Sequence, residues 1–206
     1  MSTTFDVYPG KEYIPSFAEL LDISNKKVND FLRNLGISKN ITIDVEVHNN
    51  TGELQKKFNI HDKLIWNNES YAWFFIRGVN GGTDSYYYKI TELDREIWKN
   101  EIETNIKARE LRDIINKSIN IGYYWSFRKS IGQPGIINLA YGLIAASLAE
   151  ITGGFVYSDD GAWDYSYFPA LPEDFFRWYF KPEYVVKNED KVWLQNCIKS
   201  ICKELN

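Results

Sequence analysis

The sequence is poor in the residues and motifs that usually build catalytic or metal centres. It has only two histidines, His48 and His61, and two cysteines, Cys197 and Cys202. It contains no HExxH pair, no Gly-x-Ser-x-Gly turn and no GxGxxG or GxxxxGK[ST] loop, so zincins, elbow-type serine hydrolases and nucleotide-binding folds lack their signatures here. The two cysteines fall on different faces of a helical pattern, which disfavours a disulfide between them. We therefore predict no catalytic residue, no cofactor and no metal.

Basic residues and long apolar runs are also scarce. The chain has 24 Lys and Arg against 28 Asp and Glu, a net charge of −4. This balance disfavours a general nucleic-acid binder, which presents a basic face. The apolar helix expected at residues 136–152 is too short and too polar at its ends to span a bilayer, and residues 1–6 have neither the basic start nor the apolar run of a signal peptide. We expect a cytoplasmic chain that binds neither nucleic acid nor membrane.

Aromatic residues, in contrast, are abundant. The 206 residues include 14 Tyr and 7 Trp, and hydrophobic residues make up 44% of the chain. This length suits a single domain with a sizeable core. Tyr and Trp combine an apolar ring with a polar tip, so a surplus of them predicts a surface that meets a partner.

The hydrophobic patterns predict an α+β fold with a mixed, largely antiparallel sheet of about five or six strands and helices packed on it. The expected order is an irregular arm at 1–15, two short helices within 16–36, strands at 41–47 and 53–60, a hairpin at 71–77 and 86–90, a helix at 91–116, a strand at 119–127, a helix at 136–152, a strand at 155–158, and a C-terminal helical extension at 168–206.

One stretch, residues 135–165, organises the prediction. Ile137, Tyr141, Ile144 and Leu148 recur at helical spacing among small residues, which indicates a buried helix. Gly153 is a typical helix end. With the strands expected before and after it, this helix completes a strand-helix-strand unit, and such sheets often carry their chemistry where strands end. Residues 159–165 follow the second strand and are therefore the first candidate site.

The acids of this segment have two interpretations. Asp159, Asp160 and Asp164 carry oxygens that suit a divalent cation or acid–base chemistry. Two of them are adjacent, which fails the alternating pattern of a calcium loop, and Asp and Gly are also typical of simple turns. Trp163 and Tyr165 likewise suit a protein-binding hot spot, or simple packing against the aromatic residues at 175–179.

The segment Ala149-Glu150-Ile151-Thr152-Gly153-Gly154, followed by a strand and Tyr157-Ser158-Asp159-Asp160-Gly161-Ala162-Trp163, resembles small bacterial immunity proteins encoded beside polymorphic toxins. The resemblance implies a cytoplasmic, non-enzymatic inhibitor that binds a cognate toxin. It assigns no functional residue.

We therefore predict a toxin-binding immunity protein, whose acids meet basic groups and whose rings fill pockets of the toxin. The expected surface comprises Tyr157, Asp159, Asp160, Trp163, Asp164 and Tyr165. Two alternatives stay open: a metal-dependent hydrolase that uses Asp159, Asp160 and Asp164, and a structural subunit of a phage or secretion apparatus. The oligomeric state is left open.

Overall fold

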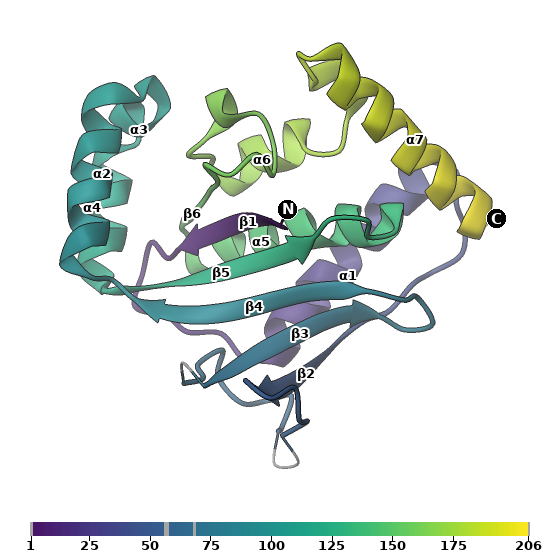
Figure 1. Cartoon of the computed structure of the whole chain (residues 1–206), viewed down its shortest axis with the longest axis horizontal. Coiled ribbons are helices and arrows are strands. Elements are labelled where there is room, and N and C mark those ends of the chain that lie inside the picture. Colours follow the sequence, from purple (N-terminus) through teal and green to yellow (C-terminus); the bar gives the residue numbers. More distant parts are fainter. Residues whose placement is uncertain (1, 56–57, 68, 206) are drawn as a thin grey trace.

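Six strands form one antiparallel open sheet in the computed structural model, which describes residues 2–55, 58–67 and 69–205. The strands lie side by side in the order β2-β3-β4-β5-β1-β6, and every neighbouring pair is antiparallel. Their bounds are β1 Ser2–Tyr8, β2 Ile43–Asn49, β3 Ser70–Ile76, β4 Gly82–Lys89, β5 Tyr123–Ser130 and β6 Phe155–Tyr157. Seven α-helices accompany the sheet within the described ranges (Figure 1). The predicted α+β class and largely antiparallel sheet are confirmed.

The first strand corrects the expectation of an irregular arm at residues 1–15. β1 lies between β5 and β6 and pairs with both. Its core residues Phe5 and Val7 are fully buried, but two apolar positions are too short a pattern to reveal a strand in the sequence. The strand-helix-strand unit is present as β5, α5 and β6. Its two strands run in the same direction but are separated by β1.

Helices α1 (Phe17–Asn34) and α5 (Gly135–Thr152) pack on each other and cover one face of the sheet (Figure 1). The ring of Phe5 stacks on that of Tyr141 in α5 at 4.6 Å. Ser16 and Glu19 form the capping box expected at the start of α1. The sequence suggested a second helix start at Ser24, which is wrong: Ser24 is fully buried inside the continuous helix α1.

Helix α5 is the buried centre of the fold. By length and composition it is long and apolar enough to cross a membrane, the one such helix in the part of the chain that the structure describes, which corrects the expectation that it is too short and too polar. In this structure 89% of it is buried within the chain. Gly153 ends it with φ 62°. A Cβ at Gly154 would lie 1.9 Å from the carbonyl oxygen of Tyr8. The end of β1 can therefore pack this closely only because residue 154 is a glycine.

The long helix expected at residues 91–116 is three helices: α2 (Glu92–Thr104), α3 (Ile106–Glu110) and α4 (Arg112–Ile121). The first break falls at Asn105, whose side-chain oxygen accepts hydrogen bonds from the backbone N–H groups of Lys107 and Ala108. Gly122, in the left-handed conformation, ends α4, so β5 begins later than the strand expected at 119–127.

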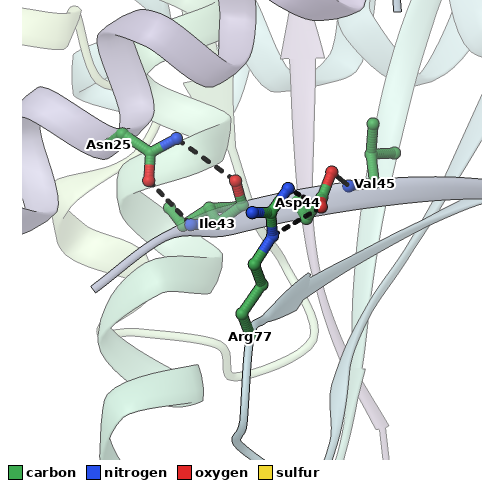
Figure 2. Close-up of polar contacts among 5 residues, drawn as sticks. All are labelled: Asn25, Ile43, Asp44, Val45 and Arg77. Atoms are coloured by element: carbon green, nitrogen blue, oxygen red, sulfur yellow. Dashed lines mark hydrogen bonds and ion pairs between the residues drawn. The ribbon is translucent and has the colours of Figure 1, made fainter. Parts of the chain in front are cut away.

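Strand β2 is an edge strand that is tied to its surroundings by side chains (Figure 2). The amide of Asn25 on α1 donates to the Ile43 carbonyl oxygen at 3.2 Å and accepts from the Ile43 N–H at 2.7 Å. On the other face, Arg77 donates to Asp44 through Nε at 2.8 Å and through Nη2 at 2.7 Å. The return strand expected at 53–60 is not formed: Leu54 makes only an isolated bridge to His48, and residues 56 and 57 lie outside the described ranges.

The second face of the sheet is open over β3, β4 and β5, and it faces the viewer in Figure 1. Only its β1–β6 end is covered, where Trp98 of α2 packs on Tyr8 and Tyr157. After β6, η1 (Tyr165–Tyr167), α6 (Pro172–Trp178), η2 (Pro182–Tyr184) and α7 (Asn188–Leu205) complete the chain. Helices α6 and α7 pack on α5, and Phe175 and Trp178 join the core.

Candidate functional site

The 159–165 loop follows β6, as predicted, but its acids have separate roles. The carboxylate of Asp160 accepts a hydrogen bond from the Thr4 N–H at 3.0 Å and one from the Ser158 hydroxyl at 3.3 Å. Because β6 pairs with β1 only from Asp6 to Tyr8, this carboxylate caps the strand edge where β6 has ended. Asp164 caps η1 by accepting from the Ser166 N–H at 3.0 Å. Both acids therefore fit the turn interpretation.

The aromatic residues of the predicted surface do not form one exposed patch. Tyr157 is buried, with 5% of its surface exposed, and packs on Trp98. Burial raises the pKa of its hydroxyl far above the usual range. Trp163 stacks on Trp178 at 5.8 Å. Tyr165 is 44% exposed, and its hydroxyl donates to Glu101 of α2 at 2.6 Å. The packing expected against residues 175–179 is thus formed by one side of Trp163, whereas Tyr157 is buried against α2.

A cavity of about 640 Å³ opens between the 159–165 loop, the ends of β1 and β5, and α7. Four of the six predicted residues line it: Asp159, Trp163, Asp164 and Tyr165. Its volume lies in the range that holds a small ligand or an inserted side chain. Its other lining residues come from distant parts of the sequence and include Lys129, Ile131, Val186, Asp190, Trp193 and Cys197.

The rim of this cavity is unusually apolar for an exposed surface. Ile131 is 77% exposed and Val186 is 74% exposed, and both line the cavity together with Trp193. Large apolar side chains grouped beside a hollow are typical of sites that bind another molecule. Neither Ile131 nor Val186 was singled out from the sequence, because nothing local distinguishes an exposed Ile or Val from a buried one.

The polar groups of the cavity do not form an activated nucleophile. Burial raises the pKa of the Cys197 thiol, against an opposing effect of Lys129, so the thiol stays protonated at neutral pH. Burial also lowers the pKa of the Lys129 ammonium group. Throughout the described ranges, no group of three or more His, Cys, Asp or Glu side chains is placed to hold a metal ion.

An acid missed in the sequence, Asp6, lies on the second face of the sheet, at its partly covered β1–β6 end beside this loop. It stands in register with Ser126 of β5 on one side and Tyr157 of β6 on the other. Burial, followed by the charges of Asp159 and Asp160, raises its pKa to about 7, although a hydrogen bond with Ser126 lowers it. Its Oδ1 atom is buried without a hydrogen-bond partner. It was overlooked because residues 1–15 were expected to be irregular.

Comparison of the chain with protein-family models, with curated proteins and with solved structures gave no match. The resemblance to immunity proteins therefore stays a prediction. The Gly153-Gly154 pair in it has a structural explanation, since these residues end α5 and admit β1.

Proposed function

We propose that the chain is a cytoplasmic, non-enzymatic immunity protein that binds and neutralises a cognate bacterial toxin. One observation carries this proposal: the 640 Å³ cavity beside the 159–165 loop, with exposed apolar side chains on its rim. Protein interfaces concentrate their binding energy in aromatic and apolar anchors that fill such hollows and are fully desolvated in the complex. An anchor side chain of the toxin would enter between Trp163 and Trp193.

The charges around the cavity suit a basic partner. Three acids, Asp159, Asp164 and Asp190, line it against two lysines, Lys129 and Lys187, and the whole chain carries a net charge of −4. Opposite charges on two partners speed their encounter and select the correct partner, even where they add little affinity. The apolar rim would then supply most of the affinity. The acids would speed association and supply specificity.

The alternatives have no comparable support. Asp159 and Asp164 both line the cavity, but Asp160 and Asp164 are engaged as backbone caps, and among the described residues no group of three or more His, Cys, Asp or Glu could hold a metal ion. A structural subunit of a phage or secretion apparatus would self-assemble, and no observation favours this over binding one partner.

The test is co-expression of the tagged full chain with the protein encoded by the adjacent upstream gene, scored by pull-down and by relief of growth arrest. We expect a tight complex and rescue. Ile131→Asp and Val186→Asp should each weaken the complex by about tenfold or more, since charges at an anchor site are strongly disfavoured. The matched control is Ile106→Asp on α3, where the wild-type side chain is 69% exposed and does not line the cavity.

Because Ile131, Val186 and Ile106 are all exposed, these variants should fold alike, which melting temperatures verify. Failure of the wild-type chain to bind or rescue would overturn the proposed function. Wild-type affinity in both rim variants would remove the cavity as its site.

A further inference from the structure

Aromatic rings run in a continuous row across the open face of the sheet. His48 on β2 lies 5.5 Å from Tyr71 on β3, and Tyr71 lies 6.1 Å from Tyr86 on β4. The row continues with Tyr86 to Tyr88 at 6.0 Å, Tyr88 to Tyr124 at 5.4 Å and Tyr124 to Tyr8 at 5.0 Å. Four of these rings, Tyr71, Tyr86, Tyr88 and Tyr124, are partly exposed. A face that folding alone required would bury them or replace them with polar residues.

This row ends beside Asp6. The strand register places Ser126 between Tyr86 and Asp6, so a small side chain separates the exposed rings from the carboxylate. The charges that act on Asp6 come from Asp159, Asp160 and Asp94, all of them acidic. A buried carboxylate oxygen without a partner, in a negative environment and next to tyrosine rings, lacks the cation that would satisfy it.

We propose that the open face binds an arginine-bearing segment of the partner protein, with the guanidinium group at Asp6 and its stem over Tyr124 and Tyr88. This inference rests on the proposed function, since it names a second contact of the same toxin. Arginine fits better than lysine because its planar fork bonds a carboxylate and stacks on aromatic rings at the same time.

Other occupants fit the face less well. Single-stranded nucleic acid also stacks on exposed rings, but it needs a positively charged track. The acids Asp44, Glu46, Asp84 and Asp6 occupy this face against two cations: Arg77 pairs with Asp44 at the edge strand, and Arg128 lies on β5 in register with Asp84. A second copy of this chain would bring the same acids against each other.

The direct test uses the full ¹⁵N-labelled chain at pH 8 and the peptide acetyl-Gly-Arg-Gly-amide. The matched probe is the same peptide with citrulline, which keeps the shape of arginine and removes its charge. We expect the arginine peptide to shift the amide signals of Asp6, Ser126 and Tyr124, and the citrulline peptide to leave them in place. Asp6→Asn should weaken the arginine peptide by about tenfold or more, and Tyr88→Leu should also weaken it. Asp22→Asn, at an exposed acid on α1, which covers the other face of the sheet, should bind as the wild type does.

The same variants tested against the upstream-encoded protein separate the two proposals. If that protein binds the chain, and Asp6→Asn binds it as tightly as the wild type, the arginine contact is overturned while the proposed function stands. If no complex forms but the arginine peptide maps to Asp6, the face binds arginine and the proposed function falls. Equal shifts with arginine and citrulline peptides overturn the inference directly.

Discussion

Asp6→Asn should make the protein more stable, and increasingly so as the pH rises. The carboxyl group of Asp6 has a pKa of about 7 in the folded chain, against an ordinary value of 3.8. The folded state therefore holds this proton more tightly than the unfolded state, and the free energy of unfolding falls as pH rises from about 4 to about 7. The loss amounts to about 1.4 kcal/mol per pH unit. Asn cannot ionise, so the free energy of unfolding of the variant does not fall in this way.

Urea unfolding of both proteins at pH 5 and pH 8 measures the effect. Between pH 5 and the pKa of about 7, the wild type loses about 3 kcal/mol relative to Asp6→Asn. The depressed pKa of Glu19, about 2, acts only at lower pH. An equal stability difference at pH 5 and pH 8 would show that Asp6 ionises as an ordinary surface acid and would refute this reasoning.

Three further outcomes follow from individual contacts. A Cβ at Gly142 would lie 2.2 Å from Cζ of Tyr179, so Gly142→Ala should destabilise the fold by about 2 kcal/mol in chemical denaturation, and adding Tyr179→Leu should recover part of that loss. Asp160→Ala removes the cap on the Thr4 N–H and should cost about 1 kcal/mol, whereas Asp159→Ala should leave the melting temperature within error. The arginine peptide should bind more weakly at pH 6 than at pH 8, because it binds ionised Asp6; Asp6→Asn should show no such difference in the same titration.

Much of the fold can be predicted from the sequence because its signals are local. The alternation of Ile43, Val45 and Val47 with polar residues marks β2, and the all-round apolar and small residues of 136–152 mark α5 as buried. The capping boxes at Ser16 and Thr91 mark two helix starts. Each of these features depends on neighbours within a few positions.

What could not be predicted depends on partners far along the chain. β1 is a strand because β5 and β6 offer it hydrogen bonds on both edges, whereas its own pattern is short. The helix expected at 91–116 breaks at Asn105, whose amide caps α3 and also donates to the Phe168 carbonyl oxygen, 63 positions away. The cavity likewise lies between β1, β5 and α7, and no local sequence pattern predicts that these elements are neighbours.

The candidate site shows the same division. The sequence identified the 159–165 loop through its composition, and four of the six predicted residues do line the cavity. For Asp160 and Asp164 it left a partner-facing role and a turn role open; Oδ1 of each carboxylate caps a backbone N–H group, as the turn interpretation has it, and a contact with a partner stays a prediction. Composition locates a segment, but only the register of neighbouring strands tells which acid is satisfied within the chain and which is not.

Asp6 is the residue where stability and binding conflict. Stability alone would favour Asn or Ser there, since a carboxylate oxygen buried without a partner is disfavoured. Violations of this kind concentrate at sites that act on something outside the fold. A guanidinium group at Asp6 would reverse the penalty, because a neighbouring cation lowers the pKa of a carboxyl group and stabilises its ionised form. Binding and ionisation are linked: the free energy by which a bound cation favours the ionised form of Asp6 equals the free energy by which ionisation of Asp6 strengthens binding of that cation. The penalty at Asp6 is relieved either by protonation or by a basic partner, and only the partner stabilises the ionised form. Asp6 therefore favours a basic partner.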